Sequence, residues 1–67
     1  MSDLTVAEKI DVLMQTMECV GSYPTRLRCI AHDCGFSMME TALLLFLTTR
    51  THHKIKHSKQ GYYIDEN

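Results

Sequence analysis

The feature that most constrains the fold is the segment of residues 27–44, which predicts two helices joined by a tight turn. Ala31 lies four residues before Gly35, and a small side chain there lets two helices approach closely. Gly35 is expected to end the first helix in the left-handed conformation, which a Cβ atom penalises. Phe36 then enters the core, and Ser37 with Glu40 has the spacing of a capping box. The segment therefore predicts a helix, a turn and a second helix.

An earlier helix is predicted from Thr5 onward. Thr5 and Glu8 form another capping-box pair, and Gly21 is the expected C-terminal stop. Apolar residues recur between them at helical spacing and form one stripe, made of Val6, Ile10, Leu13, Met14 and Met17. Tyr23 precedes a proline, which favours extended backbone, so the connector can form a short strand or bridge.

The boundaries of the other elements follow from the same signals. The second helix is expected to start near Pro24 or Thr25 and to end at Cys34, and the third covers residues 38–50. Beyond it the spacing of apolar residues becomes that of a β-strand, in which every second residue lies on the same side. This pattern covers residues 54–57 and again residues 62–64. Residues 58–61 read as the turn between them, with a glycine last. The chain is therefore expected to be mainly α, with a three-helix core and a C-terminal β-hairpin.

This order of elements resembles the winged helix-turn-helix family of DNA-binding domains, over roughly residues 5–64. The resemblance rests on the small residue, glycine, apolar residue and serine around the predicted turn, at Ala31, Gly35, Phe36 and Ser37. Thr41 departs from the pattern, because the family usually has a branched aliphatic residue there. The resemblance implies that the third helix faces the major groove and that the hairpin, or wing, contacts phosphates.

The chain has 67 residues, and we expect a single domain over residues 1–67. A domain of this size buries only about 60% of its unfolded surface, so it benefits from a partner. The predicted core combines the three helices with the hairpin. It consists of Val6, Ile10, Leu13, Met17, Leu27, Ile30, Ala31, Phe36, Leu44, Leu45 and Ile55, with one or more of Tyr62, Tyr63 and Ile64.

The predicted wing is basic although the whole chain is not. Arg50, Lys54, Lys56 and Lys59 lie within one decade of sequence that contains no acidic residue, whereas the formal net charge of the chain is −1. Such a cluster suits phosphate contact. The first functional hypothesis is therefore a small, dimeric DNA-binding transcriptional regulator of bacterial, plasmid or phage type. Its predicted DNA-binding residues are Arg26, Arg28, Ser37, Met38, Met39, Thr41, Arg50, Lys54, Lys56 and Lys59, and the resemblance also turns Ala42 toward the groove.

The third helix favours a second hypothesis. Eight of its residues between positions 38 and 47 are apolar, and no Arg, Lys, Asn or Gln precedes Arg50. Base readout depends on those polar side chains, whereas an exposed apolar patch marks a protein interface. The alternative is therefore a winged-helix adaptor or inhibitor that binds a protein partner or a second copy of itself. Its predicted interface residues are Met39, Leu43, Phe46 and Leu47.

Other functions have little support in the sequence. Cys29, His32 and Cys34 lack the ligand spacing of zinc sites, so no metal and no cofactor is expected. Three short helices and a hairpin offer no enzyme-sized pocket, so we expect neither an enzyme nor a small-molecule substrate. No apolar run approaches the length of a membrane span, and the N-terminus does not resemble a signal peptide. A cytoplasmic protein without membrane contact is expected.

Overall fold

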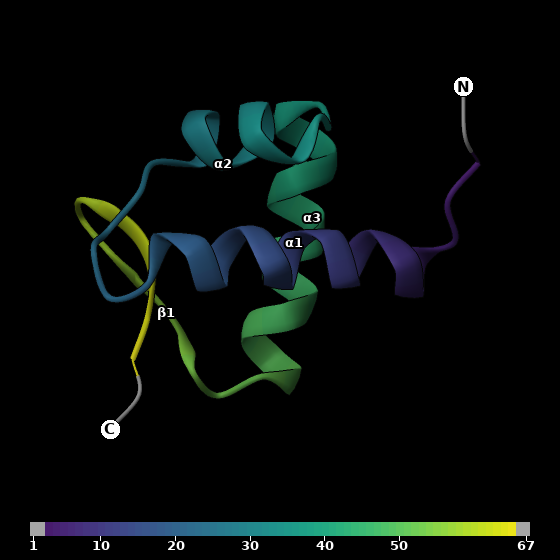
Figure 1. The fold of residues 1–67 in the computed structure, drawn as a ribbon. Coiled ribbons are helices and arrows are strands. Elements are labelled where there is room, and N and C mark those ends of the chain that lie inside the picture. Colours follow the sequence, from purple (N-terminus) through teal and green to yellow (C-terminus); the bar gives the residue numbers. More distant parts are fainter. Residues whose placement is uncertain (1–2, 66–67) are drawn as a thin grey trace.

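The computed structural model describes residues 3–65 and contains three helices followed by a hairpin (Figure 1). The elements are α1 (Val6–Val20), α2 (Leu27–Cys34), α3 (Met38–Thr51), β1 (Ile55–Ser58) and β2 (Gly61–Ile64). This architecture confirms the predicted fold class. In Figure 1, α1 crosses in front of α3, α2 lies beside the N-terminal part of α3, and the hairpin lies near the C-terminal end of α1.

Both ends of α1 follow the prediction. The Thr5 hydroxyl accepts a hydrogen bond from the Glu8 backbone N–H at 3.2 Å, and the Glu8 carboxylate accepts one from the Thr5 N–H at 2.8 Å. The bond from the Thr5 backbone N–H, followed by the interaction with the Thr5 side chain, holds the pKa of Glu8 below its ordinary value. At the other end, Gly21 has φ 68° and its N–H donates to the Met17 carbonyl. Satisfied terminal groups therefore fix the length of α1.

The turn between α2 and α3 is the one expected from Gly35. Its φ is 79°, in the left-handed region, and its N–H donates to the carbonyls of Ala31 and His32. Ser37 caps α3 by accepting from the Glu40 backbone N–H at 3.1 Å. The predicted capping box is only half formed, however, because the Glu40 carboxylate binds Lys9 on α1 instead of returning to Ser37. The Glu40 carboxylate therefore pairs with a lysine on a neighbouring helix and not with the Ser37 backbone N–H.

The start of α2 was predicted too early. Thr25 is extended and forms an antiparallel bridge with Tyr62, so α2 begins only at Leu27. The Thr25 N–H donates to the Tyr62 carbonyl at 2.9 Å, and the Tyr62 N–H donates to the Thr25 carbonyl at 2.8 Å. Sheet pairing therefore overrides the helix-start signal of the proline. The bridge lies at Thr25, just beyond the connector of residues 21–24 where it was expected.

The hairpin pairs β1 with β2 in an antiparallel register that places Ile55 opposite Ile64 and Ser58 opposite Gly61. Gly61 has φ 137°, and a Cβ atom there would lie 2.3 Å from the Thr25 carbonyl oxygen. Glycine is therefore required, both for the backbone conformation and for the close approach of the connector.

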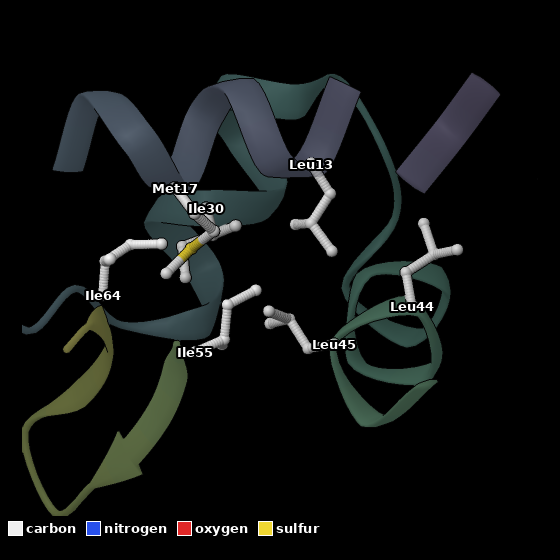
Figure 2. Close-up of a cluster of buried hydrophobic side chains, with 7 residues drawn as sticks. All are labelled: Leu13, Met17, Ile30, Leu44, Leu45, Ile55 and Ile64. Atoms are coloured by element: carbon white, nitrogen blue, oxygen red, sulfur yellow. The ribbon is translucent and has the colours of Figure 1, made fainter. Parts of the chain in front are cut away.

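The core lies where all five elements meet (Figure 2). It consists of Leu13, Met17, Ile30, Leu44, Leu45, Ile55 and Ile64. Of the other predicted core residues, Ala31 is buried, whereas Ile10, Leu27, Phe36 and Tyr62 are only partly buried. Val6 was predicted wrongly, since its side chain is 58% exposed. It lies in the first turn of α1, which extends beyond the crossing with α3 (Figure 1).

Within residues 3–65, no single helix is long and apolar enough to cross a membrane. The pair α2 and α3 passes the same test of length and composition only in combination, and it is bent by 102° at the turn.

Candidate protein and nucleic-acid interfaces

The side of α3 that faces away from the core is apolar. We call Met39, Leu43, Phe46 and Leu47 the outer face. Their exposed fractions are 76%, 61%, 58% and 46%, and Met38 at the helix start is also exposed. Spacings of three and four residues align these side chains along one side of a helix. The four residues predicted as a protein interface are thus brought together and left open by the described part of the chain.

The opposite side of α3 carries two fully buried threonines. We call Thr41, Leu44, Leu45 and Thr48 the inner face. The Thr41 hydroxyl donates to the Ser37 carbonyl at 2.8 Å, and the Thr48 hydroxyl donates to the Leu44 carbonyl at 2.9 Å. Each hydroxyl therefore satisfies its hydrogen bond within its own helix, so that its burial leaves no unpaired polar group.

Thr41 is consequently a correction to the predicted DNA-binding set. It is 0% exposed, because its position in the helix repeat places it beside Leu44, Leu45 and Thr48. A side chain in the core cannot meet base edges. Ala42, which the resemblance also turned toward a groove, is half-buried. The groove-facing set is therefore reduced to Ser37, Met38 and Met39, all exposed at the start of α3.

Arg50 lies one helical turn beyond the outer face. Its guanidinium carbon is 5.2 Å from the centroid of the Phe46 ring, in the arrangement of a cation–π contact. The spacing of four residues within a helix was the sequence signal for this pair. The contact holds the charge alongside the apolar side chains at the C-terminal end of α3, where the helix dipole favours a cation.

The basic residues of the hairpin are all exposed. Lys54 lies in the turn before β1, and Lys56 lies on the side of β1 opposite to Ile55, whose side chain is buried. Lys59 is exposed in the turn. On the Ile55 side the His57 ring stacks on Tyr62, with centroids 4.2 Å apart and planes 8° apart. The hairpin therefore presents Lys56 with its cross-strand partner Tyr63 on one side, and Ile55, His57 and Tyr62 on the other.

The remaining predicted cations lie at the start of α2. Arg26 is the N-cap residue of α2 without a side-chain cap, and Arg28 is in the first turn; both are exposed. Arg26 follows the Thr25 bridge, so its backbone adjoins the hairpin at Gly61. The backbone pairing thus brings Arg26 close to the base of the lysine-bearing turn.

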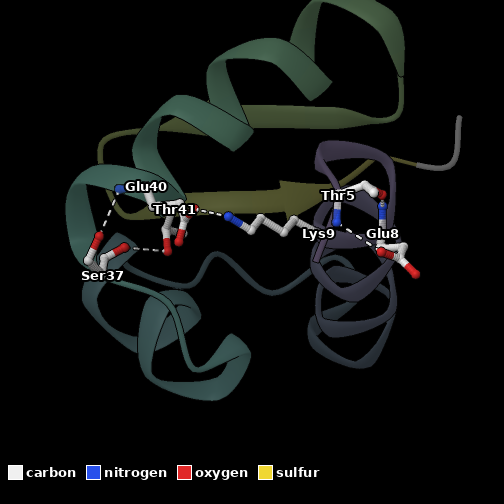
Figure 3. A network of polar contacts seen from close by, with 6 residues as sticks. All are labelled: Thr5, Glu8, Lys9, Ser37, Glu40 and Thr41. Atoms are coloured by element: carbon white, nitrogen blue, oxygen red, sulfur yellow. Dashed lines mark hydrogen bonds and ion pairs between the residues drawn. The ribbon is translucent and has the colours of Figure 1, made fainter. Parts of the chain in front are cut away.

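Three acidic residues lie on α1. Glu8, Asp11 and Glu18 are exposed along this helix. Lys9, on the same helix, forms an ion pair with Glu40 that links α1 to α3, with side-chain exposures of 27% and 37% (Figure 3). This pair joins residues far apart in the sequence and had no sequence signal. Three acids therefore lie on α1 and none lies between Arg50 and Lys59, but Asp33 is exposed on α2 and Asp65 directly follows β2, so the segregation of charge is partial.

The cysteines and histidines form no comparable cluster. Among residues 3–65, no group of three His, Cys, Asp or Glu side chains has the arrangement of a metal site. Cys34 is partly buried and its thiol donates to the Thr16 hydroxyl at 3.3 Å, whereas Cys19 and Cys29 are exposed and free.

Comparison of the chain with models of protein families, with curated proteins and with solved structures found no match.

Proposed function

We propose that the chain is a small winged-helix interaction module that binds another protein chain through the outer face of α3. The observation that carries this proposal is the exposure of four large apolar side chains on one side of a single helix. Burying such side chains away from water is worth about 25 cal/mol per Å² of apolar area. A contiguous apolar patch on a folded domain therefore favours association with another surface.

The same residues argue against base readout by α3. A helix in the major groove reads bases through hydrogen bonds from Arg, Lys, Asn or Gln side chains. The outer face has none of them, and the hydroxyl of Thr41 is buried. A winged-helix family relationship is part of the proposal, but with α3 adapted to contact protein.

Phosphate contact by the hairpin is the second candidate function, and the exposure of Lys54, Lys56 and Lys59 favours it. In this case the protein is a DNA-binding regulator in which the hairpin, with Arg26, Arg28 and Arg50, supplies sequence-independent affinity. Three of the eight acidic residues are on α1 and none lies within the hairpin, so the net charge of −1 does not describe the hairpin surface. Both candidates suit the cytoplasm, where the three free cysteines would stay reduced.

Site-specific photocrosslinking in cells that express the protein tests both candidate functions. A photoreactive phenylalanine analogue is introduced at Leu43 on the outer face, at Lys56 on the hairpin, or at Gln15 on the exposed side of α1 as the control. We expect position 43 to give a discrete adduct that resists nuclease and is destroyed by protease. A yield at position 43 no greater than at position 15 would overturn the protein-binding proposal.

The DNA candidate has a quantitative test of its own. Binding to mixed-sequence DNA is measured at several salt concentrations for the wild type and for the Lys54→Ala, Lys56→Ala, Lys59→Ala triple variant. Each phosphate contact removed lowers the slope of log K against log salt by about 0.9. We expect a loss of up to roughly 3 units, with the thermal melt unchanged because exposed lysines add little stability. Absence of salt-dependent binding by the wild type at low salt rejects this candidate.

A further inference from the structure

We infer that the occupant of the outer face is a second copy of this chain, paired through α3 in antiparallel orientation about a two-fold axis. The inference rests on the proposed function and identifies its partner. It is carried by the charges that flank the apolar residues of α3.

The two charged residues of α3 flank its outer face at opposite ends, with Glu40 at the edge nearest α1 and Arg50 beside Phe46. Glu40 is partly exposed one turn before Leu43, and Arg50 is exposed one turn after Phe46. Ten residues separate them, which is about 15 Å along a helix. Between them the outer face presents only apolar side chains. The helix is therefore acidic at one end, apolar in the middle and basic at the other end.

This pattern is complementary to itself only in one orientation. In a parallel pair, Glu40 would face the partner's Glu40 and Arg50 would face the partner's Arg50, and like charges repel. In an antiparallel pair with Leu43 level with the partner's Phe46, Arg50 lies level with the partner's Met39 and next to the partner's Glu40. Two opposite-charge pairs then close the ends of an apolar centre, and the helix dipoles also oppose each other favourably.

Contacts already present within the chain prepare this pairing. The Phe46 ring holds the Arg50 guanidinium alongside the outer face, 5.2 Å from the ring centroid. Arginine stacked on an aromatic ring keeps its donors free at the edge for a carboxylate. Lys9 holds Glu40 on the α1 side of α3 while leaving part of the side chain exposed.

Symmetry explains why one helix can supply both halves of the interface. In a two-fold dimer the same patch occurs on both subunits, so every contact is made twice. A 67-residue chain with a small core also gains stability from a partner's buried area. A single pair of helices buries less than a standard interface, so we expect micromolar rather than nanomolar self-association.

The inference is tested by charge reversal and sedimentation equilibrium. Glu40→Arg gives α3 two basic ends, and Arg50→Glu gives it two acidic ends, so each variant should self-associate about tenfold more weakly than the wild type. An equimolar mixture of the two variants should associate as tightly as the wild type, because each end then meets its opposite. The double variant Glu40→Arg, Arg50→Glu should also recover wild-type association, since both ends are exchanged.

A control variant separates the interface from the fold. Lys9→Gln removes the ion pair within the chain but leaves Glu40 and Arg50 in place, and we expect it to associate at least as tightly as the wild type. A monomeric wild type across the micromolar range, or a mixture no tighter than the single variants, would overturn the second copy as occupant. The protein-binding proposal fails separately, when the crosslinker at Leu43 gives no protein adduct; an adduct of another mass retains that proposal and rejects the homodimer.

Discussion

The inner and outer faces of α3 belong to the same fourteen-residue helix but distribute polarity in the reverse of the usual way. The inner face buries two threonines beside two leucines. The outer face exposes two leucines, a methionine and a phenylalanine. Surface helices normally bury their apolar stripe and expose the polar one.

The hydrogen bonds explain how the reversal is tolerated on the inner side. Thr41 and Thr48 donate to carbonyls one turn earlier in α3, so the surface that they present to the core is mainly their methyl groups. No comparable arrangement compensates for the outer side, where Leu43 and Phe46 meet solvent. The comparison teaches that the fold explains the inner face but not the outer face, which is the surface that we propose binds a partner.

The largest expected effect comes from shortening one leucine on each face. Leu45 is fully buried and Leu43 is 61% exposed. We expect Leu45→Ala to lower the free energy of unfolding by about 2–5 kcal/mol, because it leaves a cavity. Leu43→Ala should change it by less than about 0.5 kcal/mol in dilute protein. Urea denaturation at low protein concentration measures both free energies of unfolding. Equal losses in the two variants would contradict the assignment of the two faces.

The next effect concerns the turn that sets which side of α3 faces the core. Gly35 has φ 79° and open space where a Cβ atom would lie, so substitution meets backbone strain without a clash. We expect Gly35→Val to cost about 1–3 kcal/mol. Gly35→Asn should cost less, because asparagine adopts the left-handed conformation more readily. Thermal melts compare the two, and a valine variant as stable as the asparagine variant would count against this turn.

A smaller effect tests whether the buried threonines are retained for shape or for polarity. Thr48→Ser keeps the hydroxyl and removes a methyl group, which should cost about 1 kcal/mol. Thr48→Val keeps the shape and removes a hydroxyl that bonds only to its own helix, so we expect a smaller loss than for serine. Denaturant unfolding of the two variants ranks them, and the reverse order would show that the hydroxyl matters more.

The smallest effect is expected at α1, whose exposed side is charged in the usual way. The pKa of Glu8 is lowered from 4.5 by its bonds with Thr5, so Glu8 binds its proton less readily folded than unfolded. Its stabilising contribution should therefore be complete above about pH 4.5 and disappear as the pH falls through the folded pKa. Melts of Glu8→Gln and wild type should converge in acid, and an NMR titration of Glu8 measures the pKa directly. Equal melting temperatures of the variant and the wild type at neutral pH would contradict the capping box.

Much of the fold could be predicted from local signals. Gly35, Gly21 and the pair Thr5 and Glu8 each act within a few residues of sequence, so their roles are visible without the tertiary structure. The alternation around Ile55 likewise predicted a strand with its lysines outward. These features depend on backbone conformation and short-range hydrogen bonds, which residues close together in the sequence determine.

The errors concern residues whose environment is set by distant parts of the chain. Val6 fits the apolar stripe of α1 but lies beyond the crossing with α3. Glu40 fits a capping box but binds Lys9, and Thr41 looks like a polar reader but lies in the core. The start of α2 was displaced by the pairing of Thr25 with Tyr62. The exposure of the predicted interface residues did follow from sequence, because α3 has more apolar residues than one buried side can hold.

The bridge between Thr25 and Tyr62 has a consequence for the order in which the protein can fold. It joins the connector after α1 to a strand that follows all three helices, and Ile64 donates in addition to the carbonyl of Gly21. During synthesis from the N-terminus, α1 and α2 emerge long before β2 is available. Met17 and Ile30 therefore lack their contact with Ile64 until translation of the hairpin is complete. The closing step is a long-range pairing, which forms more slowly than the local contacts within the helices.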